Sequence, residues 1–263
     1  AAAGDNGIGT AGAGYEAGLA GVRLIAEPAS GEDIADAMVH QTTAENPDDL
    51  IAISSNSWGP RDDGQTIGGS GTLVDQAFET AITDGREGKG TIIIFAAGNG
   101  ASNLVNAPSN YGSCTLSGPG TFTTDNLEEQ EGISFGYNLF GYTGTFGGTS
   151  SAAPLVSGVI SLMLEANPAL TWRDVQHILV ETSTRIDEEN EGWFENGSGR
   201  WFNHNYGFGR VDAQRAVSTA AEWENRWRGW RTEARKSPTT TQTVSASPFR
   251  FLPKRSFSRS TWR

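Results

Sequence analysis

The sequence predicts an α/β fold organised around a mainly parallel sheet. Apolar runs at residues 49–55 and 91–97 have the length and composition of buried strands. An amphipathic helix predicted between them, over residues 73–85, is the crossover that parallel neighbours require. A second, apolar helix over residues 155–166 follows a run of small side chains, so it can pass close to a sheet. Functional side chains are expected at the carboxyl edge of this sheet, where open α/β folds place their sites.

Shorter patterns predict the other elements. Residues 21–25 carry a short strand signal, and residues 32–40 have the apolar spacing of an amphipathic helix. Thr171 precedes Asp174 by three positions, which approximates a capping box at the start of another helix. Aromatic residues and glycines over residues 193–204 indicate a hairpin. The predicted domain therefore continues well beyond the apolar helix.

Charge divides the chain into a large domain and a tail. The 263 residues carry a net charge of −12, but ten of the 19 Lys and Arg lie in residues 226–263 together with one acid. Nine bases then face 30 acids in residues 1–225, a net charge of −21. An acidic body suits a protein that acts on basic substrates or binds calcium, although ordinary solubility also explains it. We expect a folded domain over residues 1–227 and a basic tail over residues 228–263 that is too polar to fold.

Composition disfavours several classes of partner and location. No run of eighteen apolar residues is present, so no membrane-spanning helix is predicted. Cys114 is the only cysteine, which excludes an intrachain disulfide. Aromatic residues among the arginines of the tail could contact membrane or nucleic acid, but a solvated tail is the simpler interpretation, and no nucleic-acid partner is expected. No α/β-hydrolase elbow of the form G-x-S-x-G occurs.

The most informative stretch is Gly147-Gly148-Thr149-Ser150-Ser151-Ala152-Ala153-Pro154, which opens the apolar helix. It puts Ser150 at or just before the first helical turn. There, unpaired backbone N–H groups and the positive end of the helix dipole favour a developing oxyanion, so Ser150 is a candidate nucleophile. The spacing is equally consistent with Thr149 or Ser150 acting only as the N-cap. The local pattern leaves both interpretations open.

A second candidate follows the predicted strand at residues 91–97. Asn99 lies between Gly98 and Gly100, and an asparagine flanked by glycines can direct its amide toward a reacting carbonyl. Without other context, Asn-Gly predicts a turn. The presence of Ser150 downstream favours a functional role for Asn99.

These motifs resemble the subtilase superfamily of serine proteases. The pattern G-T-S-x-A-A-P at residues 148–154 is similar to the nucleophile motif of that superfamily, and Y-G-x-G-x-x-D-A at residues 206–213 is similar to its kexin and furin branch. The resemblance implies a subtilisin-like three-layer α/β fold, incomplete at its N-terminus. It implies a serine endopeptidase that cleaves polypeptide substrates after basic residues. It also implies a location in the secretory pathway or outside the cell.

The resemblance assigns roles to individual residues. Ser150 would be the nucleophile, and Asn99 would complete the oxyanion hole. Three residues match the segment that lines the primary specificity pocket in kexin-like enzymes: Ser57, Trp58 and Gly59. Asp62 matches the acid at the floor of that pocket, which holds the arginine before the scissile bond through charge-assisted hydrogen bonds. A plain surface turn is the alternative for Asp62.

The start of the chain resembles the tight calcium site of subtilases. By that analogy the Asn6 side chain and the carbonyls of Ala3, Ile8 and Thr10 would supply hard oxygen ligands for Ca²⁺. The carboxylate that completes the site in the family is expected before Ala1. A plain Asn-Gly turn accounts for the same residues equally well.

The resemblance leaves the catalytic base unassigned. A serine hydroxyl needs an adjacent base, and that base needs an orienting partner. The three histidines are His40, His177 and His204, and none has the His-Gly-Thr context of the subtilase base. Both partners are therefore expected in sequence before Ala1, and the chain also lacks a segment that the family carries after the oxyanion asparagine. The alternative function is an inactive fragment or pseudo-protease, at most a peptide-binding module.

Overall fold

The computed structural model describes residues 4–5, 7, 10–25, 28–44, 46, 49–59, 69–99, 121–124, 142–146 and 148–224, with the backbone alone for residues 121–124 and 142–146. The helices and strands of this part of the chain are, in order, α1 Gly31–Val39, β1 Ile53–Asn56, α2 Thr72–Gly88, β2 Ile92–Phe95, β3 Thr121–Thr124, β4 Tyr142–Phe146, α3 Thr149–Ala166, α4 Trp172–Thr182, β5 Trp193–Glu195, β6 Trp201–Asn203 and α5 Ala213–Glu222. The predicted domain boundary at residue 227 lies outside the described residues and stays a prediction.

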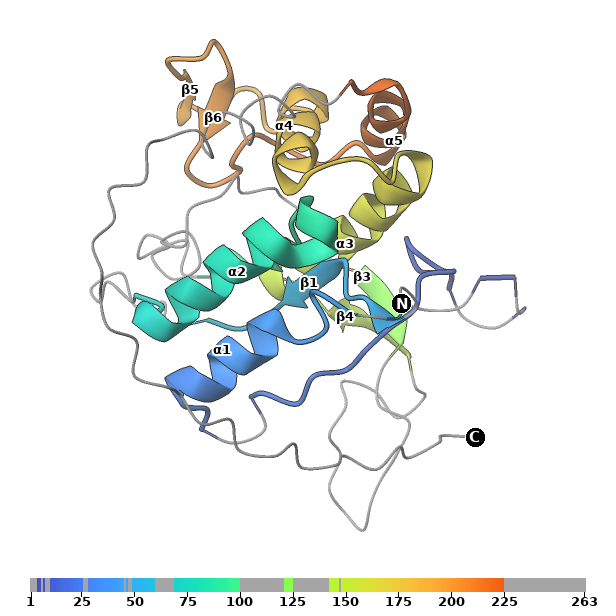
Figure 1. The fold of residues 1–263 in the computed structure, drawn as a ribbon. Helices are drawn as coiled ribbons and strands as arrows, with labels where there is room; N and C mark the ends of the chain where they lie inside the picture. Colours follow the sequence, from blue (N-terminus) through green and yellow to red (C-terminus); the bar gives the residue numbers. More distant parts are fainter. Residues whose placement is uncertain are drawn as a thin grey trace, which may run out of the picture. The chain divides into compact units, whose positions relative to one another are not determined.

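A parallel pair of strands, β1 and β2, forms the centre of the α/β layers. Ile53 lies opposite Ile92 and Asn56 opposite Phe95, and α2 provides the crossover between the strands. Helices α1 and α2 pack together on one side of this pair, whereas α3 packs against β1 and β2 from the other side (Figure 1). This layering agrees with the predicted parallel α/β arrangement. Both strands are shorter than the apolar runs that predicted them, because only four residues of each are paired.

The strand predicted over residues 21–25 does not form. Val22 and Ile25 are 46% and 66% exposed, and these residues belong to no strand. A strand signal is realised only where a neighbouring strand takes up the backbone hydrogen bonds. Here a pocket lies between residues 20–25 and β1, so no ladder joins the two segments.

Helix α3 is the centre of the hydrophobic core. Seven of its residues are buried, and four of them, Val156, Val159, Ile160 and Met163, join a cluster with residues of β2, α4 and α5. By length and composition α3 is also apolar enough to cross a membrane. Its packing against β1, β2 and α5 accounts for this apolar character as that of a core helix.

Local signals predicted several elements correctly. The helix predicted over residues 32–40 is α1, and Ser30 and Asp33 form a capping box at its start. The predicted capping box of Thr171 and Asp174 is present at the start of α4. The hairpin predicted over residues 193–204 consists of β5 and β6, paired antiparallel. Each of these features depends on residues that are close in sequence.

Asp174 also connects α4 to the end of α5. Its side chain is fully buried, and Oδ2 accepts hydrogen bonds from the Thr171 N–H at 2.8 Å and the Thr171 hydroxyl at 2.6 Å. Oδ1 accepts from the indole Nε1 of Trp223 at 2.9 Å. One carboxylate thus satisfies three donors from two separate parts of the chain. Its loss would remove the acceptor that the Thr171 N–H and the Trp223 indole share.

Replacing Asp174 by alanine is expected to lower the free energy of unfolding by about 3 kcal/mol, because the buried carboxylate loses its two hydrogen bonds from Thr171 together with the hydrogen bond from Trp223, although the Thr171 hydroxyl can still accept from the backbone N–H of residue 174. Urea unfolding of the chain, followed by tryptophan fluorescence, measures this loss. Asp212→Ala is the matched control, since Asp212 caps α5 by accepting one hydrogen bond from the Arg215 N–H, and its loss should cost about 1 kcal/mol. Equal losses in the two variants would contradict the connecting role of Asp174.

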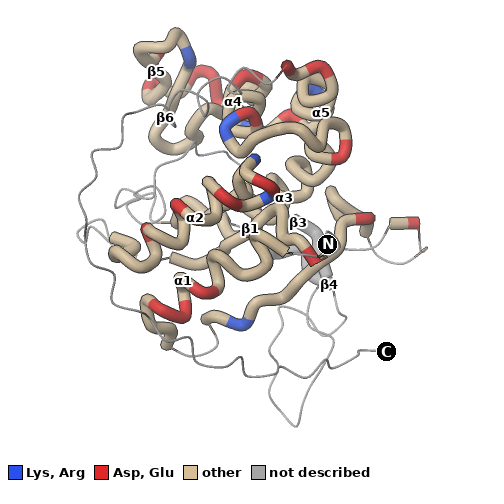
Figure 2. Tube along the Cα trace, viewed as in Figure 1, with Lys and Arg blue, Asp and Glu red and all other residues tan. Residues whose placement is uncertain are grey.

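Acidic side chains predominate on the helices of one layer. Helix α1 contains Glu32, Asp33 and Asp36 and neither Lys nor Arg. Figure 2 shows a similar excess of acidic positions along α2. This side of the domain is therefore anionic, which favours basic ligands over acidic ones.

Candidate active site

The candidate nucleophile lies in the first turn of α3. The N-cap is Gly148, with a φ of 74°, and no side chain caps the helix. Ser150 is therefore the second residue of the helix, and the alternative in which Thr149 or Ser150 is only the N-cap is wrong. A Cβ at position 148 would lie 2.7 Å from Asn99 Oδ1. Glycine is thus required there both for its backbone conformation and for the close approach of Asn99.

Asn99 contacts the start of α3 directly. Its Oδ1 accepts a hydrogen bond from the Thr149 N–H at 2.8 Å. The Thr149 hydroxyl oxygen lies 3.1 Å from the same Oδ1 and 3.0 Å from the Gly98 carbonyl oxygen, and it accepts from the Gly98 N–H at 3.1 Å. These contacts join the loop after β2 to a helix 50 residues further along the chain. Because Oδ1 is occupied as an acceptor, the exposed Asn99 side chain presents its Nδ2 group as a donor.

The backbone of the first turn offers a further donor. The N–H groups of Ser151 and Ala152 both donate to the Gly148 carbonyl, at 3.1 and 3.3 Å. The Ser150 N–H, in contrast, has no acceptor among the residues that the structure describes. An unpaired N–H at a helix N-terminus, near the positive end of the dipole, is suited to bind an anionic oxygen. The Ser150 hydroxyl, its N–H and the Asn99 amide are therefore grouped at one end of α3.

The segment after β1 also reaches this helix. Pro154 has no N–H, so the carbonyl of Ser150, four residues earlier, lacks its usual helical donor. The Ser57 hydroxyl donates a hydrogen bond to that carbonyl at 2.9 Å. The proline thus leaves the Ser150 carbonyl free to accept this hydrogen bond, which connects the end of β1 to the candidate nucleophile.

Aromatic contacts hold the rest of this segment. The Trp58 ring packs edge-on against Phe95 of β2, with 5.3 Å between the ring centroids, and its Nε1 donates to Asn56 Oδ1 at 3.1 Å. Gly59 follows and is exposed. The predicted substrate-binding residues 57–59 therefore lie at the carboxyl end of β1, at the same edge of the sheet as the start of α3.

Four predicted site residues lie outside the described residues: Ala3, Asn6, Ile8 and Asp62. Thr10 is described, and its hydroxyl donates to the Ala11 carbonyl at 3.4 Å. Within the described ranges, no group of three or more His, Cys, Asp or Glu side chains could hold a metal ion. The predicted calcium ligands are amide and carbonyl oxygens, which that finding does not cover. The calcium site and the role of Asp62 stay predictions.

The three histidines lie at or beside three different elements, α1, α4 and β6. His40 is the C-cap residue of α1, on the opposite side of β1 from α3. His177 is exposed on α4. His204 follows β6, and its ring packs against Phe194 and Phe202 with centroid separations of 5.6 and 5.5 Å. We assign none of the three as the base for Ser150.

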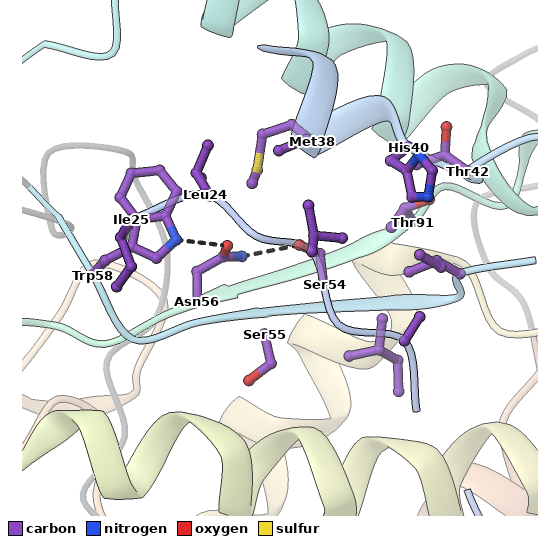
Figure 3. A pocket seen from close by; sticks show the side chains of 15 residues that line it. Leu24, Ile25, Met38, His40, Thr42, Ser54, Ser55, Asn56, Trp58 and Thr91 are labelled. Atoms are coloured by element: carbon purple, nitrogen blue, oxygen red, sulfur yellow. Dashed lines mark hydrogen bonds between the residues drawn. The ribbon is translucent and has the colours of Figure 1, made fainter. Parts of the chain in front are cut away.

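A pocket of about 240 Å³ lies on the α1 side of β1 (Figure 3). Leu24 and Met38 line it from the chain segments above the strand, and Asn56 lines it from β1 itself. Ser55 points the other way, toward α3, where the Ser157 hydroxyl lies 3.0 Å from the Ser55 hydroxyl. Helix α3 therefore lies on the side of β1 opposite the pocket, whereas Trp58, one of the predicted substrate-binding residues, is among the residues that line the pocket.

Comparison with known proteins identifies the family. The family model described as Subtilase family matches residues 1–127 and 101–209. This chain belongs to the subtilase family. Human furin is 35% identical over 85% of this subtilase, kexin of Saccharomyces cerevisiae 34% over 81%, and human proprotein convertase subtilisin/kexin type 4 36% over 85%. These relatives confirm the predicted kexin and furin branch. The matches cover 30%, 28% and 32% of the relatives, so this subtilase spans about 30% of their length.

Solved structures agree with the fold of this subtilase. The serine protease of Aeromonas sobria, in complex with its chaperone, has a TM-score of 0.62 at 24% identity, over 84% of this chain and 51% of that one. A protease from Pseudoalteromonas arctica has a TM-score of 0.56 at 24% identity, over 84% and 68% of the two chains. At this identity the likeness concerns the fold, and it confirms the predicted subtilisin-like α/β class.

Proposed function

We propose that this subtilase is a serine endopeptidase of the kexin type in which Ser150 is the nucleophile. The observation that supports this best is the hydrogen bond from the Thr149 N–H to Asn99 Oδ1, which holds an amide donor beside the helix turn that carries a serine. The Ser150 hydroxyl would attack the peptide carbonyl and form a tetrahedral intermediate. Asn99 Nδ2 and the Ser150 N–H would stabilise its oxyanion, where preorganised donors contribute most to catalysis.

The proton of Ser150 has to pass to a general base during the attack. The sequence contains no His-Gly-Thr motif, and the settings of His40, His177 and His204 do not favour them for this role. We therefore propose roles for the nucleophile, the oxyanion donors and the substrate segment, and none for a base within these 263 residues.

Basic residues before the scissile bond are the proposed specificity. Residues 57–59 would pair with the substrate backbone, and Asp62 would bind an arginine side chain through charge-assisted hydrogen bonds. The anionic surface of α1 and α2 favours such substrates electrostatically (Figure 2). A structural Ca²⁺ held by Asn6 and nearby carbonyls, and a location in the secretory pathway or outside the cell, are proposed from the same family resemblance.

Fluorophosphonate labelling tests the proposal, because this reagent modifies activated serines selectively. We expect the complete product of the gene to be labelled. Cleavage after glutamate should locate the label in the fragment of residues 132–165, and tandem mass spectrometry should assign it to Ser150. A folded gene product that contains a His-Gly-Thr motif and still remains unlabelled would overturn the proposal.

An inactive peptide-binding module is the second candidate. The absence of a His-Gly-Thr motif from these 263 residues favours it, and so does the family resemblance, which implies that a segment is missing after Asn99. Such a module would bind an arginine-containing peptide at residues 57–59 and release it intact, which fluorescence anisotropy and mass spectrometry can detect together. Hydrolysis of the same peptide by the 263-residue chain would exclude this candidate.

Asp62→Asn is expected to lower kcat/KM about 10²-fold for a peptide with arginine before the scissile bond, because the carboxylate that would pair with the guanidinium is replaced by an uncharged amide. The value for an otherwise identical alanine peptide should not change. Asp63→Asn, at the neighbouring acid, is the matched control and should leave both values unchanged. Equal losses for the two peptides would show that Asp62 does not select arginine.

A further inference from the structure

We propose that Asn196 carries an N-linked glycan whose first sugar packs against Phe194. Asn196-Gly197-Ser198 is the only Asn-x-Ser/Thr sequon in the 263 residues that lacks proline at its middle position. It lies in the turn that connects β5 and β6. The inference rests on the secretory location proposed above, because such sequons are modified in that compartment.

The hydrogen bonds of the turn leave available Asn196 Nδ2, the atom to which the glycan would be attached. Asn196 Oδ1 accepts from the N–H of Ser198 at 3.0 Å, from the N–H of Arg200 at 3.0 Å and from the hydroxyl of Ser198 at 2.7 Å. Two backbone donors identify this atom as the carbonyl oxygen, so Nδ2 faces away from them. Nδ2 donates no hydrogen bond to any residue that the structure describes. A sugar on Nδ2 therefore leaves all three bonds in place.

The turn also has room for a large substituent. Gly197, Ser198 and Gly199 are exposed, and a Cβ built at position 197 would meet no atom within 4 Å. Gly199 has a φ of 73°, which lets the chain turn back into β6. A glycan at this position can therefore extend into solvent without displacing the hairpin.

Strand geometry puts Phe194 on the same face as Asn196. The Asn196 N–H donates to the Arg200 carbonyl at 2.8 Å, so the pairing of β5 with β6 continues to Asn196, and residues two apart share a face. Phe194 is 43% exposed although it is a large apolar side chain. Covering such a ring with the apolar face of a sugar removes it from water. Trp201, which is 45% exposed, lies on the opposite face of the hairpin.

The proposed modification is the transfer of an oligosaccharide from a lipid-linked donor to Asn196. Asn196 Nδ2 attacks C1 of an oligosaccharide carried on a polyprenyl diphosphate. The new C1–N bond replaces the C1–O bond, the lipid diphosphate leaves, and Nδ2 gives one proton to a base of the transferase. The hydrogen bonds at Oδ1 do not take part in this exchange.

Secretion of the full chain from a eukaryotic host tests the site. Peptide-N-glycosidase should increase the electrophoretic mobility of the wild-type chain and leave aspartate at position 196 in the tryptic peptide of residues 186–200. Asn196→Gln and Ser198→Ala should show no such shift, whereas Ser198→Thr, which keeps the sequon, should retain it. A secreted wild-type chain without the shift would overturn the proposal.

The contact with Phe194 has its own measurement. Removal of the glycan should lower the melting temperature of the wild-type chain by about 2 °C, the size expected for one aromatic contact in a chain of this length. The decrease should persist in Trp201→Ala and disappear in Phe194→Ala, each variant being compared with its own deglycosylated form. A decrease that persists in Phe194→Ala would overturn the contact. Neither readout measures hydrolysis, so both results are independent of the role of Ser150.

Discussion

Replacing Ser150 by alanine is expected to abolish fluorophosphonate labelling and to lower kcat about 10⁶-fold, the loss known for removal of the nucleophile in subtilisin. The hydroxyl is the attacking atom of the proposed mechanism, and no other group in the first turn of α3 can replace it. The fold should survive, because Gly148 and not Ser150 is the N-cap and the Ser150 carbonyl that accepts from Ser57 is retained. Labelling and peptide hydrolysis by the complete gene product measure the effect.

Ser151 provides the matched control for this experiment. It is the adjacent serine, it lies in the same helical turn, and it is 2% exposed, so a substrate carbonyl cannot reach it. Ser151→Ala should keep labelling and kcat within a few-fold of the wild-type values. Labelling that is lost in Ser151→Ala and retained in Ser150→Ala would exchange the roles of the two serines and refute the proposed site.

Asn99→Asp is expected to lower kcat by about 10²–10³, the range known for loss of one oxyanion donor in subtilisin, with little change in KM. The aspartate keeps an oxygen that can accept from the Thr149 N–H, so the contact between the β2 loop and α3 should remain. It removes the N–H donor and adds negative charge where the oxyanion develops. Steady-state kinetics on an arginine peptide, with the complete gene product, measure both parameters.

Two further variants separate the positioning of Asn99 from its chemistry. Asn99→Ala removes the acceptor for Thr149 as well as the donor, so it should also lower the thermal stability of the protein, whereas Asn99→Asp should not. Asn205→Asp, at an exposed asparagine in the turn after β6, introduces the same charge and should leave kcat unchanged. A loss of kcat in Asn205→Asp of the size seen in Asn99→Asp would show that net charge, rather than the oxyanion donor, is responsible.

Features encoded by neighbouring residues could be predicted from the sequence. The capping box at α4, the hairpin of β5 and β6 and the apolar face of α3 all depend on residues a few positions apart. The strand expected over residues 21–25 does not form, because a strand depends on a partner that is distant in sequence. Its apolar residues have strand character, but a strand requires a partner for its backbone hydrogen bonds, and no local pattern indicates whether that partner lies close enough.

The connecting roles of Thr149 and Pro154 were not predicted. Thr149 was considered only as a helix cap, yet its hydroxyl and N–H hold the loop that carries Asn99. The absent N–H of Pro154 was visible in the sequence, but its consequence, a free Ser150 carbonyl, matters only because Ser57 lies within hydrogen-bond distance. Both signals lay in the motif, whereas both partners lie in segments that follow strands distant in sequence.

The sequence by itself determined the class of fold, the helix that carries Ser150 and the resemblance to subtilases, because apolar spacing and short motifs are local properties of the chain. Tertiary structure decided whether Ser150 caps that helix or lies within its first turn. It also decided which residues the helix start meets: Asn99 is 50 residues away and Ser57 is 93. The parallel pairing of β1 and β2 makes these contacts possible, since it brings the ends of both strands to the same edge of the sheet, where α3 begins.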